Sequence, residues 1–343
     1  MRPRGIWLAR RLTSSACLLA AAACAPEATT PALPAPRVKV FETAALHLDR
    51  IYTSMVGPFE RIPLATSDLD WVTALRTDVI DAATGEPMGD EFLCHAQVQL
   101  PSTVRIVTTA TGFPEIRLPA GFGIPLTRIL RAFPQQERAP TFFGMLLNNH
   151  EPDIDRYGRV RATIEYYTDE DVGSPPKLKK LFIASLPVTV EDLAGYRPAE
   201  GEPNADVSTH CMLVEGRTNH WIVPPGPQRT RKRFTELVPV DGTVHVAAVH
   251  LHNYGVSMRL TDVTTGELLW QSDVAYEPDR LQIARIPLYS SATGFPIYRD
   301  HEYEVEAFYD NTTDHDVDAM AMMYLYYHPA GDEDIAYPTE LQS

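Results

Sequence analysis

Short apolar segments separated by turn-forming residues run through this sequence from residue 37 onward. Each segment is rich in aromatic or β-branched residues, and Gly, Pro, Asn or Asp ends it within a few positions. Such spacing is typical of β-sandwiches, in which short strands alternate with tight connections. The pattern predicts an all-β fold with one short helix at residues 126–133.

The segment at residues 191–208 is polar and contains prolines, which is the composition of a linker between domains. A chain of 343 residues is long enough for two domains. We therefore predict two tandem jelly-roll-like β-sandwich domains, at residues 41–190 and 209–330, followed by a tail at 331–343. A Thr-Gly-Glu turn follows an Asp-led segment in each half, which also favours two related halves.

The first 23 residues have the pattern of a secretion signal. Several arginines precede an apolar run at residues 12–23, which is well short of the roughly 20 residues needed to cross a bilayer. Three alanines before Cys24 resemble a bacterial lipobox, although Ala21 stands where that pattern prefers Leu. We expect a protein anchored to a bacterial membrane by a lipid on Cys24, facing the periplasm or the cell surface, with residues 24–40 as a tether. Ordinary signal-peptidase cleavage at an A-x-A site is the alternative.

The charge balance bears on the kind of partner. The chain carries 30 Lys and Arg against 45 Asp and Glu, a formal net charge of −15. No basic patch is dense enough to suggest a polyanion, so nucleic acid is not expected as a partner.

Two histidines, His250 and His252, lie two positions apart in the strand-like segment 244–254. Alternate residues of a strand point to the same side, so the two imidazoles project from one face about 6.7 Å apart. By the same parity, Met320 and Tyr324 share one face of a later strand-like segment. Two imidazoles and a thioether are a ligand set that favours copper, especially Cu(I). The same patterns also occur as half-buried polar residues and as methionine-rich core strands.

These segments resemble the second copper site of the copper type II, ascorbate-dependent monooxygenases, the family of peptidylglycine α-hydroxylating monooxygenase and dopamine β-hydroxylase. That family holds its catalytic copper with an H-x-H pair and a methionine on a later strand that ends in aromatics. The matching residues are His250, His252 and Met320, and Tyr324 matches a tyrosine that lines the substrate cavity. The resemblance implies that Met320 and Tyr324 lie at the catalytic copper.

Cys94 and His95 match the adjacent histidine pair of the family's first copper site, and His150 matches the single histidine that follows it. The resemblance implies that these three residues hold a second copper, which relays electrons. Neighbours on a regular strand face opposite ways, so Cys94 and His95 reach one ion only if the strand is bulged or ends there. Two cysteines of an exported protein also suit a Cys94–Cys211 disulfide, and a buried thiol without function is a third alternative.

The chain departs from the peptide-amidating members of the family. Ala248 stands where they have an arginine that binds the peptide carboxylate, so peptidylglycine is not expected as substrate. The resemblance implies a monooxygenase that uses two copper ions, O2 and an ascorbate-like reductant to hydroxylate an unidentified small molecule. The alternative is a non-catalytic lipoprotein that holds one copper at His250, His252 and Met320, so enzymatic activity stays open.

Overall fold

The computed structural model describes residues 33–52, 57–65, 68–101, 104–191, 212–213, 217–278 and 282–332. The chain divides into two compact units, residues 1–33 and 34–343, and the fold described below is that of the second unit. The expected signal segment, Cys24, Cys211, almost all of the linker and most of the tail lie outside the described residues. Among the described residues, no helix is long and apolar enough to cross a membrane.

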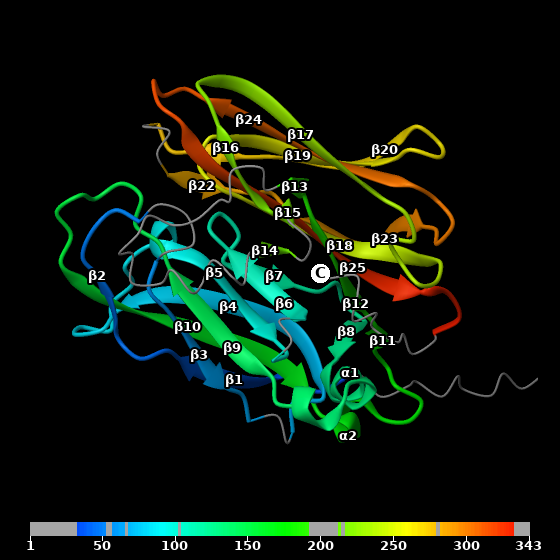
Figure 1. Cartoon of the computed structure of the whole chain (residues 1–343). Helices are drawn as coiled ribbons and strands as arrows, with labels where there is room; N and C mark the ends of the chain where they lie inside the picture. Colours follow the sequence, from blue (N-terminus) through cyan, green and yellow to red (C-terminus); the bar gives the residue numbers. More distant parts are fainter. Residues whose placement is uncertain are drawn as a thin grey trace, which may run out of the picture. The chain divides into compact units, whose positions relative to one another are not determined.

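The prediction of an all-β sandwich fold is confirmed (Figure 1). The described residues form two short α-helices, α1 (Leu126–Ala132) and α2 (Asp169–Val172), and α1 occupies the segment predicted to be helical. The strands form two sandwiches, each of two stacked sheets.

The first sandwich stacks a sheet of order β1-β10-β4-β8-β11, with β2 and β7 at its side, on a sheet of order β3-β9-β5-β6. The strands are β1 (Arg37–Glu42), β2 (Leu46–Leu48), β3 (Phe59–Pro63), β4 (Trp71–Asp81), β5 (Leu93–Gln99), β6 (Arg105–Ala110), β7 (Glu115–Arg117), β8 (Phe122–Pro125), β9 (Thr141–Leu146), β10 (Arg156–Tyr167) and β11 (Lys179–Lys180).

The second sandwich stacks an inner sheet of order β12-β25-β18-β23, extended by β16, on an outer sheet of order β17-β24-β19-β20. The strands are β12 (Phe182–Pro187), β16 (His220–Val223), β17 (Gly226–Phe234), β18 (Gly242–Leu251), β19 (Gly255–Asp262), β20 (Glu267–Asp273), β23 (Tyr289–Ile297), β24 (Tyr303–Asn311) and β25 (Val317–Pro329). Two small sheets complete the described strands, β13 (Val190–Glu191) with β14 (Met212–Leu213) and β15 (Arg217–Thr218), and β21 (Ala275–Tyr276) with β22 (Ile283–Arg285).

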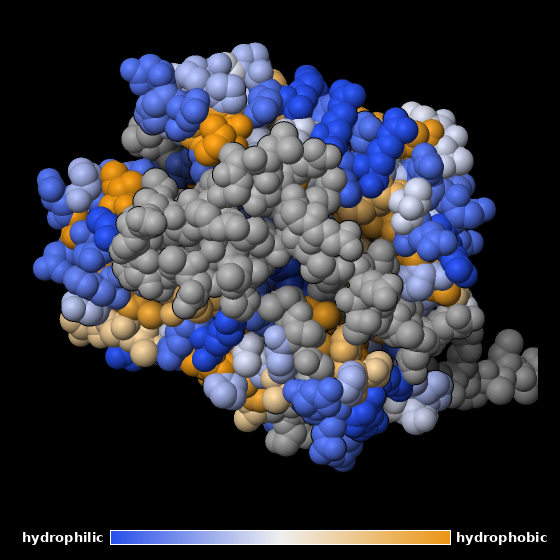
Figure 2. All heavy atoms as spheres, viewed as in Figure 1, coloured by the Kyte–Doolittle hydropathy of each residue, from blue (hydrophilic) through white to orange (hydrophobic). Residues whose placement is uncertain are grey.

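Burial distinguishes outer strands from the strands between the sandwiches. Along β17, Arg229, Arg231 and Arg233 are exposed and alternate with half-buried residues, as expected for a strand with one face in water. Figure 2 shows a hydrophilic surface over this sheet, at the top of the view. By contrast every residue of β5, and nearly every residue of β18 and β25, is buried. Both faces of these three strands are therefore covered, one within its own sandwich and one by the other sandwich.

Strand pairing and side-chain hydrogen bonds join the halves of the chain. β12, which lies in the range predicted for the first domain, pairs antiparallel with β25 of the second sandwich. The backbone N–H of Thr108 on β6 donates to the Tyr326 hydroxyl on β25 at 3.2 Å. These contacts bring the inner sheets of the two sandwiches face to face, and the histidines of interest lie between them.

Candidate metal centre

The second sandwich gathers three histidines on one face of its inner sheet. In the β18–β25 pair His250 lies directly opposite Met322, and in the β16–β25 pair His220 lies directly opposite Met320. Directly opposite residues of an antiparallel pair project to the same side. His252 follows β18 with the parity of His250, so all five side chains belong to the face turned toward the first sandwich.

A buried tyrosine hydroxyl fixes this end of β18 against β25. The backbone N–H of His252 donates to the Tyr309 hydroxyl oxygen at 3.1 Å, and the hydroxyl donates to the carbonyl of Met320 at 2.5 Å. Tyr309 is 1% exposed, and burial raises its pKa well above the ordinary value. The hydroxyl therefore stays protonated, and it holds the backbones of His252 and Met320 in fixed register.

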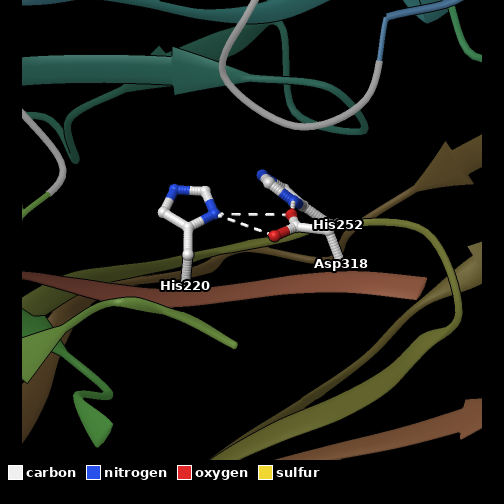
Figure 3. Close-up of side chains that lie close together, drawn as sticks. All are labelled: His220, His252 and Asp318. Atoms are coloured by element: carbon white, nitrogen blue, oxygen red, sulfur yellow. Dashed lines mark hydrogen bonds and ion pairs between the residues drawn. The ribbon is translucent and has the colours of Figure 1, made fainter. Parts of the chain in front are cut away.

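Asp318 on β25 lies between two imidazoles (Figure 3). His252 Nδ1 is 2.8 Å from Asp318 Oδ2, and His220 Nδ1 is 3.3 Å from the same oxygen. Burial acts to raise the pKa of Asp318, but the two histidines outweigh it and hold that pKa well below its usual range. An ionised carboxylate accepts the Nδ1–H of both rings, which leaves the Nε2 lone pairs turned away from it.

His250 is the least satisfied polar residue of the group. Its side chain is buried, with the residue 3% exposed, and neither ring nitrogen has a hydrogen-bond partner in the described part of the chain. Burial, followed by the neighbouring His252 and His95, lowers its pKa well below the ordinary value, so the ring is neutral. A buried polar group without a partner costs about 1–3 kcal/mol. A bound cation that accepts a nitrogen lone pair removes this cost.

Cys94 and His95 on β5 reach the same place from the first sandwich. The β5–β9 register shifts between Leu93 and His95, so Cys94 lies in a bulge, the condition under which neighbouring residues can turn to one side. Cys94 Sγ is 3.3 Å from His95 Nδ1, and the ring of His95 stacks on Phe143 at 5.2 Å. Burial, helped by the charge of Arg105, lowers the pKa of His95 to about 3.

The four rings form a chain of neighbours. Ring centroids are 5.7 Å apart for His95 and His250, 5.4 Å for His250 and His252, and 5.3 Å for His252 and His220. With metal–nitrogen bonds of about 2.0–2.1 Å, two imidazoles on one ion place their centroids about 5–5.5 Å apart. Two neighbouring pairs of rings in the second sandwich, His250 with His252 and His252 with His220, therefore have the spacing of two imidazoles on one ion. His220, His252 and Asp318 also place one ligand atom each within 4.8 Å of one another.

A cavity of about 290 Å³ opens onto the cluster. Cys94, His250, His252 and Asp318 line it on the side of the imidazoles. Apolar residues from both sandwiches, among them Leu147 on one side and Leu251 and Ile283 on the other, form much of the remaining wall. A small molecule in this cavity would lie beside the imidazoles, as a catalytic metal site requires.

Two residues singled out from the sequence lie apart from this cluster. The His150 ring packs on Phe92 at 5.3 Å, and its Nδ1 is 3.0 Å from Asn149 Oδ1. Among the described residues, His150 does not join Cys94 and His95 in a compact three-ligand group. Tyr324 is buried on β25 opposite Ala248, two positions beyond Met322 on the same face, and it is not part of the cavity wall.

Sequence reasoning missed His220 and Asp318. His220 is a lone histidine, which is most often structural, and Asp318 belongs to an acidic alternation that resembles a calcium loop. The useful signal was parity, because Asp318 lies two positions before Met320 and so shares its face. His220 gave no signal of its own, since only the pairing of β16 with β25 brings it to the site.

The low pKa of His95 predicts how the stability of the metal-free protein depends on pH. Below about pH 6.5 the unfolded chain protonates this histidine, whereas the folded protein does not until about pH 3. Stability should therefore fall by about 1.4 kcal/mol per pH unit on account of His95 as the pH drops through this window. Urea unfolding with a chelator at pH 7.5, 6.0 and 5.0 measures the slope. In His95→Leu the slope of the unfolding free energy against pH should be smaller by about 1.4 kcal/mol per pH unit, the contribution of one proton. Equal slopes in both proteins would contradict the prediction.

No family model and no curated protein matches the chain. Among solved structures, the atomic structure of Sulfolobus Turreted Icosahedral Virus is similar with a TM-score of 0.35 and 7% identity, covering 89% of this chain and 94% of that chain. A recombinant N-glycanase F (PNGase F) is similar with a TM-score of 0.35 and 11% identity, covering 85% and 96%. At these TM-scores the likeness bears on neither ligand nor activity.

Proposed function

We propose that this protein binds a copper ion through the imidazoles of His220, His250 and His252. The observation that carries the proposal is the buried ring of His250, which has no hydrogen-bond partner among the described residues and lies beside a second imidazole at metal-site spacing. Asp318 supports it, because a carboxylate on the far nitrogen of a ligating histidine fixes the tautomer and raises its basicity.

The donor set favours copper over other metals. Imidazole suits zinc, copper, nickel and iron alike, and a thiolate suits zinc as well as Cu(I), whereas a thioether favours the softer Cu(I). Met320 and Met322 lie on the same face as the histidines, and Cys94 lines the adjoining cavity. Copper would supply redox chemistry at this place when bound. The chain's own residues lower the pKa of His250 and His252 by burial, orient His220 and His252 through Asp318 and give small molecules access.

Metal loading tests the proposal. Protein stripped with a chelator is incubated with Cu(I) under reducing conditions, desalted and analysed for metal and protein content. We expect one copper per chain, because the imidazoles form one group of neighbours. Copper at background level after desalting would overturn the proposal.

Replacing Met320 by isoleucine should weaken Cu(I) binding by about 10–100-fold and leave zinc affinity unchanged, because the thioether is a ligand for soft Cu(I) and not for zinc. Swaps that conserve volume cost less than about 1.5 kcal/mol, so the fold should persist. Competition with chromophoric chelators measures both affinities. The matched control is Met258→Ile, a buried methionine on β19 of the same sandwich. Equal Cu(I) affinities in the two variants would remove Met320 from the site.

Copper-dependent monooxygenation is the second candidate, and the cavity beside the imidazoles favours it. In that reaction one atom of O2 enters a C–H bond of a small substrate, while the other leaves as water with two electrons and two protons from an ascorbate-like reductant. Ascorbate-driven O2 uptake that requires both copper and His250 would support it. Stoichiometric copper without such uptake would leave the non-catalytic copper-binding protein. Export and anchoring through Cys24 remain predictions in either case.

A further inference from the structure

We propose that Cys94 and His95 of the first sandwich complete the metal site begun by the second, so that one ion bridges the two sandwiches. The inference rests on the proposed function, since it concerns the same ion. It replaces the arrangement expected from the sequence, in which these two residues serve a separate copper.

The ring of His95 lies beside the ring of His250. Its ring lies 5.7 Å from that of His250, against 5.4 Å between His250 and His252. Only a few tenths of an ångström separate this distance from the spacing of two imidazoles on one ion. His95 is 8% exposed and neutral, and its Nδ1 faces Cys94. When Nδ1 carries the ring proton, Nε2 offers its lone pair.

The Cys94 sulfur lies on the same side of β5 as the ring of His95. The bulge at Cys94 turns its side chain to the face of His95, and Cys94 lines the cavity together with His250 and His252. A separation of 3.3 Å between Sγ and Nδ1 suits a hydrogen bond from the ring N–H to a thiolate, which leaves Nε2 of His95 and the sulfur to face the ion. A thiolate with Cu(I) is electrically neutral, which lowers the cost of burying the ion.

Contacts between the inner sheets hold the two sandwiches together in the absence of metal. The hydrogen bond from Thr108 to Tyr326 and the pairing of β12 with β25 hold the inner sheets together without metal. The ligands of both sandwiches are therefore in position before the ion binds, and ordering them adds little to the free-energy cost of binding. An ion held from both sides should then stabilise the interface between the sandwiches by mass action.

Cu(I) affinity measured by chelator competition in His95→Leu tests the bridge. We expect the Cu(I) affinity to fall by about 100-fold or more. Losing a partner that only orients a ligand costs about 10–100-fold, and losing a ligand itself should cost at least the upper end of that range. The rise in melting temperature on adding copper should shrink in parallel. The matched control is His150→Leu, because the sequence grouped His150 with Cys94 and His95. This substitution should leave both the Cu(I) affinity and the rise in melting temperature unchanged.

Loading with Co(II) reports the thiolate directly, through a sulfur-to-cobalt charge-transfer band in the near ultraviolet. The band should appear in the wild-type protein and in Cys211→Ser, and it should vanish in Cys94→Ser. If the Cys94 variant does not fold, the wild-type spectrum decides, because absence of the band excludes a thiolate ligand.

Failure of the bridge and failure of the proposed function are distinguishable. Wild-type affinity in His95→Leu, together with loss of copper in His250→Leu, would overturn the bridge and leave the site of the second sandwich. Absence of copper from the wild-type protein would overturn both.

Discussion

Replacing His250 by leucine is expected to abolish stoichiometric copper binding and, at the same time, to stabilise the metal-free protein. Leucine has a similar volume and no polar atoms, so it fills the same space without the two buried nitrogens, which have no hydrogen-bond partner in the part of the chain that the structure describes. Removing an unsatisfied buried polar group should raise the free energy of unfolding by about 1–3 kcal/mol. Metal analysis after desalting and urea unfolding in the presence of a chelator measure the two effects.

The control for this substitution lies on the same strand. His245 is also a buried histidine of β18, but its Nδ1 is 2.9 Å from the carbonyl of Ser291 and its ring packs on Phe122 at 4.1 Å. His245→Leu should keep copper binding and lose about 1 kcal/mol of stability with its hydrogen bond. A His250→Leu protein that is less stable without metal than the wild type would mean that His250 serves the fold rather than a ligand.

The fold was predictable because its signals are local. Alternating burial along β10, with Val160, Ala162 and Ile164 inside and polar residues between them, follows from the period of a strand and can be read from the sequence. The same holds for the short helix α1. The runs of β18 and β25 were recognisable as buried strands for the same reason, and parity predicted His250 and His252 on one face, where their rings lie 5.4 Å apart.

The composition of the site was less predictable because it depends on which sheets face each other. No local pattern states that β5 of the first sandwich meets β18 of the second, and this meeting places His95 beside His250. The bulge at Cys94 follows from the register of β5 on β9, which is a tertiary property. His220 joins through a strand of only four residues. A family resemblance supplied residue types for two copper sites, whereas the packing of the sheets places two residues expected at different sites, His95 and His250, side by side.

Substituting asparagine for Asp318 should weaken copper binding by about 10–100-fold, the usual cost of losing an outer-shell partner of a ligating histidine. The carboxylate accepts an Nδ1–H from both His220 and His252. An asparagine oxygen can accept from one ring, while its amide N–H groups face the other and favour a proton on that ring's Nε2. One imidazole then loses the lone pair that would face the ion, although every ligand is still present.

The matched control for Asp318→Asn is Asp316→Asn, which removes the same charge two positions earlier at an exposed residue of the cavity wall. If the carboxylate of Asp318 acted only through its charge, the two variants would weaken copper binding to a similar degree. If it sets the tautomers, Asp318→Asn alone should weaken binding. The metal-free Asp318→Asn protein should also lose stability at pH 7, because this carboxylate, whose pKa is lowered in the fold, contributes stability above about pH 4. Unchanged copper affinity in Asp318→Asn would separate the carboxylate from the metal and leave it as a structural partner of two buried rings.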